Sequence, residues 1–147
     1  MREILFRGKR IDNGEWVEGY VGIFKGETQI YVPFTAEEEK ENEGHIFSVI
    51  GGLWHTIDPF TVGQFTGLTD KNGKKIFEGD IVKTVTFSFD CDKFITEVKF
   101  GARSGVQGFY LANGRSMFYF GQKNITVMED TEVIGNIHDN PELLENP

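Results

Sequence analysis

Short runs in which apolar and polar residues alternate, separated by glycine-bearing turns, occupy almost the whole sequence. Alternation with a period of two is typical of β-strands, whereas an amphipathic helix needs apolar residues spaced three and four apart. No long run with helical spacing occurs. The sequence therefore predicts an all-β, mainly antiparallel protein with a few short helical turns.

The first part of the chain, residues 1–60, reads as a region of β-hairpins. Residues 3–7 and 15–24 are predicted to pair, with Asn13-Gly14 in a type I′ turn, because this dipeptide tolerates positive φ at both central positions. Further strands are predicted at 28–34, 45–50 and 53–57. Asp58-Pro59 places an N-cap residue before proline, which predicts one helical turn.

An acidic segment, residues 35–44, interrupts this region. Thr35 and Glu38 have the spacing of a capping box, which favours a helix start. No apolar face follows, so such a helix has nothing to bury. We therefore expect an acidic loop here.

The second part, residues 61–147, contains seven short strands linked by turns rich in glycine, asparagine and aspartate. Strands in this number and spacing predict a small curled sheet or an SH3-like barrel. A helical turn is expected after Asn140, where proline follows. We expect a seam near residue 60 that separates the two regions, although one integrated domain is the alternative.

The stretch DKNGKKIFEGDIVK, residues 70–83, combines two sharp turns with a short strand. A phosphate-binding loop would need a glycine-rich loop that leads into a helix, and the residues that follow here are strand-like. We therefore interpret the glycines and acids as architecture. The predicted structural turn motif comprises Gly67, Asp70, Asn72, Gly73, Gly79, Asp80, Gly135 and Asn136.

No residue type recurs in a pattern that indicates catalysis, a cofactor or a metal. Cys91 is the single cysteine and is flanked by acids that raise a thiol pKa. His45, His55 and His138 lack ligand spacing. The carboxylates that remain as an acid/base option for a small hydrolase are Asp70, Glu78, Asp80, Asp90, Asp92 and Glu97.

Net charge is −8, which argues against a dedicated binder of duplex DNA. Between residues 70 and 123, however, nine basic residues stand against six acidic ones. Basic and aromatic residues on neighbouring strands are typical of single-strand binders. The predicted nucleic-acid face comprises Lys71, Lys74, Lys75, Lys83, Lys99, Arg103, Arg115 and Lys123.

Several strands carry apolar residues on both faces, and residues 116–121 (SMFYFG) do so most clearly. Such a strand is buried on both sides or lies against a second chain. We therefore expect contact with another protein, with self-association into a homo-oligomer as the first choice. No run approaches the ~20 apolar residues of a membrane helix, and the first residues lack a secretory pattern, so we expect a cytoplasmic protein without a membrane partner.

Three blocks resemble the YopX family of small phage and prophage proteins. TVGQFTGLTDKNGKKIFEGDIV at 61–82 is similar to the central signature of the family, REILFR at 2–7 to its opening strand, and EVIGNIHDNPELL at 132–144 to its closing segment. Residues 35–52 and 101–124 match no motif of the family. The resemblance implies a mostly β protein of phage or prophage origin in the host bacterial cytoplasm, and it carries over no activity and no catalytic residue.

The sequence thus predicts, first, a non-enzymatic phage or prophage protein that acts through protein–protein contact. The second hypothesis is a single-stranded nucleic-acid binder that uses the basic face of residues 70–123. The third is a hydrolase built on paired carboxylates.

Overall fold

The structure is a computed structural model that describes residues 4–41, 43–44, 51–85, 93–103, 106–113, 116–119 and 130–145. For residues 102–103, 106–107, 112–113 and 116–119 it describes the backbone alone. Backbone contacts divide the chain into two compact units, residues 3–64 and 65–147, here called the N-terminal and C-terminal units. The predicted strand at 45–50 lies outside the described residues. No described helix is long and apolar enough to cross a membrane.

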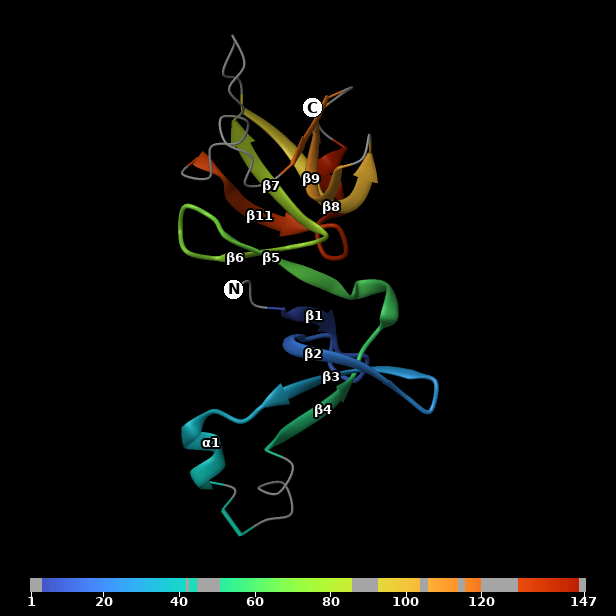
Figure 1. Ribbon diagram of the computed structural model, residues 1–147, viewed down its shortest axis with the longest axis vertical. Helices are drawn as coiled ribbons and strands as arrows, with labels where there is room; N and C mark the ends of the chain where they lie inside the picture. Colours follow the sequence, from blue (N-terminus) through green and yellow to red (C-terminus); the bar gives the residue numbers. More distant parts are fainter. Residues whose placement is uncertain are drawn as a thin grey trace. The chain divides into compact units, whose positions relative to one another are not determined.

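The predicted all-β, antiparallel class is confirmed, and most of its strands are labelled in Figure 1. The SH3-like barrel, one of two forms predicted for residues 61–147, is not found, since neither sheet closes into a barrel in the described part of the chain. In the C-terminal unit the strand order is β10-β9-β8-β7-β11. Its end strands, β10 and β11, do not pair with each other in the residues that the structure describes, so the sheet is open there.

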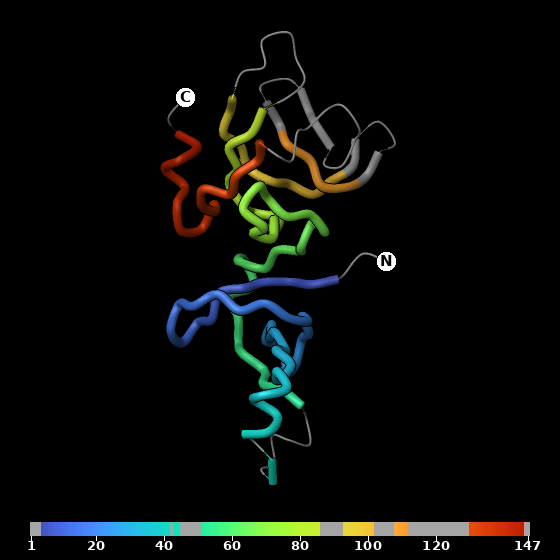
Figure 2. The backbone as a smooth tube through the Cα atoms, turned by 90° about the vertical axis from the view of Figure 1, so that its left-hand side faces the viewer, coloured from blue at the N-terminus to red at the C-terminus, as the bar shows by residue number. Residues whose placement is uncertain are grey.

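The N-terminal unit is an antiparallel meander of β1 (Phe6–Lys9), β2 (Trp16–Phe24), β3 (Glu27–Pro33) and β4 (Gly52–Thr56). The strands lie in the order β4-β3-β2-β1, and the tube in Figure 2 follows these successive reversals. The first two residues of β5 (Gly63–Thr69) add to the free edge of β1, where Arg7 pairs with Gly63.

The predicted pairing of β1 with β2 is confirmed, but the predicted type I′ turn at Asn13-Gly14 is wrong. Gly14 has a φ of 72° whereas Asn13 does not have positive φ, and the loop is held by Arg10 N–H donating to the Glu15 carbonyl at 2.8 Å. Positive φ at both central residues is found instead in the two-residue turn between β2 and β3, at Lys25 (50°) and Gly26 (78°). Because only two residues separate those strands, this is the position that requires the primed turn.

The N-terminal sheet curls so that the chain beyond β4 meets β1. Arg10 and Ile57 form a β-bridge, and Ile11 N–H donates to the Thr56 carbonyl at 3.2 Å. The inner face of this curl holds the apolar core of the unit, with Ile30 and Ile57 almost fully buried. The sheet can curve tightly because Gly19, which has no side chain, lies on this inner face. A Cβ atom at Gly19 would lie 2.0 Å from the Tyr31 carbonyl oxygen.

Residues 36–41 form a short α-helix, α1 (Ala36–Glu41), where an acidic loop was predicted. The capping box that the sequence offers is made in both directions. Thr35 N–H donates to Glu38 Oε2 at 2.9 Å, and Glu38 N–H donates to Thr35 Oγ1 at 3.2 Å. These bonds, together with acids in the first turn, stabilise the helix although all of its residues are exposed.

Both predicted helical turns are present as 3₁₀ turns. The first, η1 (Pro59–Thr61), is capped by Asp58, whose Oδ1 accepts from Phe60 N–H at 3.1 Å. The second, η3 (Pro141–Leu144), follows Asn140. In both, proline occupies a first-turn position where its missing N–H costs no hydrogen bond.

The C-terminal unit contains the rest of β5 with β6 (Lys75–Phe77), β7 (Asp80–Val85), β8 (Lys93–Arg103), β9 (Val106–Asn113), β10 (Ser116–Tyr119) and β11 (Glu132–Asn136). Alternation along β7 places Val82 and Thr84 inside and Lys83 outside, as the period of two requires. The buried apolar cluster comprises Ile76, Val82, Val98, Leu111 and Val133.

A buried carboxylate joins the β5–β6 hairpin to β11. Asp70 Oδ1 accepts from the N–H groups of Asn72 and Lys74, both at 2.9 Å, and Oδ2 accepts from Val133 N–H at 3.0 Å. Lys71 N–H also donates to the Thr131 carbonyl at 2.9 Å. The hairpin is thereby fixed to a strand 63 residues further along the chain.

The second turn of the stretch, at residues 78–80, bonds to β8 and to the residue that follows β11. Gly79 has a φ of 91°, its N–H donates to the Val98 carbonyl at 2.9 Å, and its carbonyl accepts from Ile137 N–H at 2.9 Å. Asp80, which is 1% exposed, accepts from Phe77 N–H at 2.8 Å through Oδ2. The two turns predicted in DKNGKKIFEGDIVK therefore reverse the chain direction and also hydrogen-bond to other strands of the sheet.

The first prediction concerns the curl of the N-terminal sheet. Gly19→Ala should lower the free energy of unfolding by about 3 kcal/mol, because its Cβ meets a backbone oxygen that cannot move aside. The measurement is urea denaturation followed by tryptophan fluorescence. Gly26→Ala is the control, since open space surrounds that position and positive φ alone costs about 1 kcal/mol. Equal losses in the two variants would contradict the argument.

The second prediction concerns Asp70. Burial, the largest influence, raises the pKa of this carboxyl, but the N–H groups of Val133, Lys74 and Asn72 together outweigh it, so the pKa lies below its ordinary value. A depressed pKa contributes stability above the unfolded value of about 3.9, and this stability is lost as pH falls through the folded value.

Asp70→Asn should therefore cost about 1 to 3 kcal/mol at neutral pH, because an amide N–H replaces an acceptor that faces a buried N–H. The difference between the wild type and the variant should shrink below about pH 4. Denaturation across pH measures both. The exposed Asp130→Asn is the control, and a difference that is independent of pH would contradict the assignment.

Candidate functional site

The residues predicted as a structural turn motif lie at turns and irregularities of the C-terminal unit. Gly67 has a φ of 87° and lies where the β5–β6 register shifts. Gly135 lies at the shift between β11 and β7, and the Asn136 side chain accepts from His138 N–H at 3.0 Å. Gly73, with a φ of 81°, forms the hairpin tip beside Asn72. Within the described residues, no group of three or more histidine, cysteine or acidic side chains has the arrangement of a metal site.

Four of the carboxylates considered for acid/base chemistry lie in the described structure. Asp70 and Asp80 are buried and accept backbone N–H groups, as described above. Glu78, in the turn before β7, and Glu97, on β8 opposite Ile81, are half-buried. Asp90 and Asp92 lie outside the described residues, as do Cys91 and His45.

The structure brings together two members of the predicted nucleic-acid face and adds one that was not predicted. Lys83 on β7 and Lys99 on β8 share the outer face of the C-terminal sheet, and Lys93 joins them there. Lys83 lies opposite Ile95, and Lys99 lies opposite Tyr110. We call Lys83, Lys93 and Lys99 the lysine face.

The other predicted members lie elsewhere or outside the description. Lys71 forms an ion pair with Glu132 at 3.3 Å, Lys74 is exposed at the hairpin tip, and Lys75 lies 5.8 Å from the centre of the Phe65 ring. The side chain of Arg103, and all of Arg115 and Lys123, lie outside the described residues. The side chains of the two-faced strand at 116–121 do so as well.

The N-terminal unit presents an aromatic surface that the sequence analysis did not single out. Register places Tyr20, Tyr31 and Trp54 side by side across β2, β3 and β4, on the face opposite Ile30. Alternation along β2 brings Trp16 and Phe24 to the same face. Phe24, Trp54 and Tyr20 are 62%, 52% and 50% exposed. We call Trp16, Tyr20, Phe24, Tyr31 and Trp54 the aromatic face.

Trp54 occupies the edge of this face and leans across the sheet. Its ring centre lies 5.2 Å from that of Tyr31, with the planes tilted by 46°. A Cβ atom at Gly22, two strands away, would lie 3.2 Å from the indole. Glycine there lets the indole lie close to the backbone. Beside it is a hollow of about 410 Å³ lined by Gly22, Ile23, Phe24, Gln29 and Trp54.

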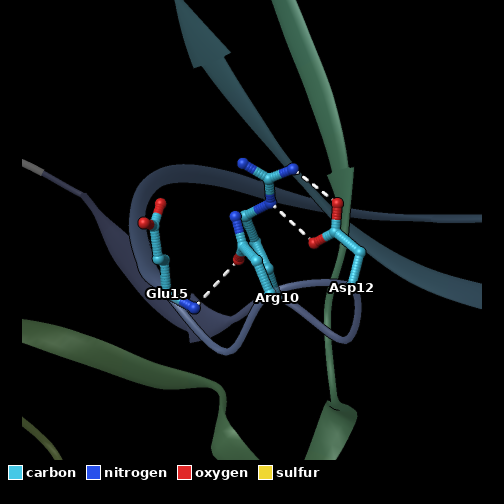
Figure 3. Close-up of polar contacts among 4 residues, drawn as sticks. Arg10, Asp12 and Glu15 are labelled. Carbon is cyan, nitrogen blue, oxygen red and sulfur yellow. Dashed lines mark hydrogen bonds and ion pairs between the residues drawn. The ribbon is translucent and has the colours of Figure 1, made fainter.

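A second hollow, of about 320 Å³, borders Trp54 on its other side, where residues 10–12 approach β4. Arg10 and Asp12 line it. Their side chains, shown in Figure 3, are paired through contacts of 2.9 and 2.6 Å. This pairing raises the pKa of Arg10 and lowers that of Asp12, so both stay charged and cancel each other. Burial lowers the pKa of His55, and the Arg10 charge lowers it further, against the opposing effect of Asp12.

One signal in the sequence pointed to the aromatic face. Residues 16–24, WVEGYVGIF, carry Trp16, Tyr20 and Phe24 on one face and Val17, Val21 and Ile23 on the other. This is the same two-faced pattern from which a contact surface was predicted in the second half of the chain. In the described structure, four of the five exposed aromatic side chains lie in the first half of the chain, and the fifth is Phe100.

Comparison with known proteins supports the whole-chain resemblance. The family model described as "YopX protein" matches residues 5–145. The crystal structure of protein EF1440 from Enterococcus faecalis is similar with a TM-score of 0.52 and 24% identity, over 98% of this chain and 99% of that one. At that identity the similarity concerns the fold alone. A search of curated proteins gave no match. From the family match over nearly its whole length, we conclude that the chain belongs to the YopX protein family.

Proposed function

We propose that this YopX-family protein is a non-enzymatic contact protein of phage or prophage origin that self-associates in the cytoplasm of the host bacterium. The aromatic face of the N-terminal unit is its contact surface. Family membership supports the origin, and the exposed aromatic surface supports the mode of action.

One observation carries this proposal: the large apolar side chains that remain exposed are concentrated in the N-terminal unit. Among the described residues, those of the C-terminal unit are Ile95, Phe100 and Leu144, whereas those of the N-terminal unit are Ile4, Ile11, Tyr20, Val21, Ile23, Phe24, Leu53, Trp54 and Phe60. Three of them, Tyr20, Phe24 and Trp54, belong to the aromatic face, and exposed apolar surface of this kind marks interaction sites in soluble proteins. Tryptophan and tyrosine are the residue types that interfaces favour.

The chemistry of the polar groups near this surface is consistent with binding and not catalysis. Arg10 and Asp12 neutralise each other, and the described side chains that line the larger hollow offer only the Gln29 amide and the Trp54 indole for hydrogen bonding. Asp70 and Asp80, the buried acids of the other unit, already accept backbone hydrogen bonds. Buried carboxylates held in this way stabilise structure.

The third prediction tests self-association by sedimentation velocity over a range of micromolar concentrations. The wild type should sediment above the 16.7 kDa of one chain, and its average mass should rise with concentration. Trp54→Ser should weaken association roughly thirtyfold, since a buried aromatic anchor contributes about 2 kcal/mol.

Ile95→Ser is the matched control, because it removes an exposed apolar side chain from the other unit and should leave association unchanged. Circular dichroism establishes that each variant is folded. A wild type that stays monomeric at all concentrations would overturn the proposed self-association.

A second candidate function, single-stranded nucleic-acid binding, is favoured by the lysine face. Its lysines are exposed on the same side of β7 and β8, next to Ile95 and Tyr110. Cations interleaved with apolar and aromatic side chains are the composition of single-strand binding surfaces. The net charge of −8 opposes it, so it ranks second.

The fourth prediction tests this candidate with a fluorescent oligothymidine between about 50 and 200 mM salt. Binding through the lysine face should weaken as salt rises. Changing Lys83, Lys93 and Lys99 together to Gln should reduce the slope of log K against log salt by about 2, at about 0.7 per phosphate contact on a single strand. Changing the same lysines to Arg keeps the charge and should keep the slope. No binding at the lowest salt would eliminate this function.

A further inference from the structure

We propose that two copies of the chain associate by antiparallel pairing of β4 with β4 of the second copy, about a two-fold axis that passes beside Leu53. This inference rests on the proposed self-association and names its geometry. Each step follows from the register of β4 and from what borders its outer edge.

Strand β4 lies at the end of its sheet, and no described strand of the chain pairs along its outer edge. The β3–β4 ladder shows which backbone groups face outward. Phe34 N–H donates to the Gly51 carbonyl and Ile57 N–H donates to the Thr28 carbonyl, both within the ladder. Positions 51, 53, 55 and 57 therefore bond to β3, and by alternation positions 52, 54 and 56 present their N–H and C=O groups to the outside.

The carbonyl of Thr56 points outward, as this alternation predicts, and it is already hydrogen-bonded to another segment of the chain. It accepts from Ile11 N–H at 3.2 Å, and beyond it Asp58 N–H donates to the Lys9 carbonyl at 2.9 Å. From Thr56 onward, the outer edge of β4 is therefore paired with the residues that follow β1. Gly52 and Trp54 remain as the outward-facing positions that a partner strand can reach.

If β4 of a second copy pairs antiparallel about an axis at Leu53, symmetry gives hydrogen-bond partners to the backbone groups of both Gly52 and Trp54. Gly52 pairs with Trp54 of the second copy, and Trp54 pairs with Gly52 of the second copy, each pair exchanging both backbone hydrogen bonds. The arrangement also uses the smaller hollow, because Gly51 and Gly52 of the second copy pass beside Trp54, His55 and Thr56, which line it. Glycines need little room there.

The side chains of β4 fit such a pairing. Its sequence, Gly-Leu-Trp-His-Thr, has no lysine, acid or proline, the residues with which proteins protect exposed sheet edges. The two Leu53 side chains, 38% exposed in one chain, meet directly across the axis. The two Trp54 side chains lie on the same face, so the aromatic faces of both copies become one continuous surface.

The fifth prediction is a cysteine cross-link at the axis, made in a Cys91→Ser background because Cys91 is the single native cysteine. Leu53 would face its own copy as a pair without mutual backbone bonds, where Cα atoms lie about 4.5 Å apart, a distance that a disulfide spans. Leu53→Cys should form a covalent dimer on mild oxidation, at least about tenfold faster than Ile23→Cys. Ile23 is the control because it is 78% exposed on the same side of the sheet but on β2.

A charge exchange gives a second, independent test. Leu53→Lys and Leu53→Glu should each be monomeric alone, because like charges would lie directly opposite each other across the axis. An equimolar mixture of the two should associate again. Such a rescue requires residue 53 to face residue 53.

The outcomes separate this inference from the proposed function. A wild-type oligomer without preferential cross-linking at residue 53 and without charge rescue overturns β4 pairing and leaves self-association standing. A wild type that is monomeric throughout overturns both. Cross-linking together with rescue supports the two-fold pairing.

Discussion

A buried carboxylate is the constraint on which the C-terminal unit depends. Asp70 is 6% exposed, and a charge in that position is tolerated only because three backbone N–H groups point at it. Two of those donors belong to its own hairpin and one to β11, so a local turn also closes a contact between distant segments. The turn at residues 78–80 does the same through Gly79, which bonds to both β8 and the chain after β11. Hydrogen bonds from these two turns thus connect distant segments of the open sheet.

The N-terminal unit has a different problem, because a single curled layer has only one face to bury. Its inner face takes Ile30 and Ile57 and requires glycine at positions 8 and 19, where a Cβ atom would collide with neighbouring atoms. On the outer face, Tyr20, Phe24 and Trp54 remain at least half exposed. A sheet with apolar side chains on a face that no second layer covers exposes that apolar surface to water. Such a surface is usually buried by association with another chain. This is the physical reason for placing the contact surface on this unit.

Most of the elements could be predicted, because each has a local cause. Alternation gave the strands, Asp58 and Asn140 before proline gave the two 3₁₀ turns, and the glycines of residues 70–83 gave the reversals. The errors were also local in origin. Asn13-Gly14 lies in a loop too wide for a type I′ turn, and the capping bonds of Thr35 and Glu38 formed a helix that has no apolar face. The lysines at 83 and 99 could be placed on one face because alternation sets the side on which each lies.

The sequence alone determined the fold class, the turns and the family resemblance, since these depend on neighbours along the chain. Only the tertiary structure decided that Asp70 bonds to Val133, that Tyr20, Tyr31 and Trp54 lie in one row, and that no described strand pairs with the outer edge of β4. These facts depend on strand order and register, which bring together residues far apart in sequence. A strand with two apolar faces has the same sequence pattern whether it is buried or exposed. Only the presence or absence of a neighbouring layer in the structure distinguishes the two cases.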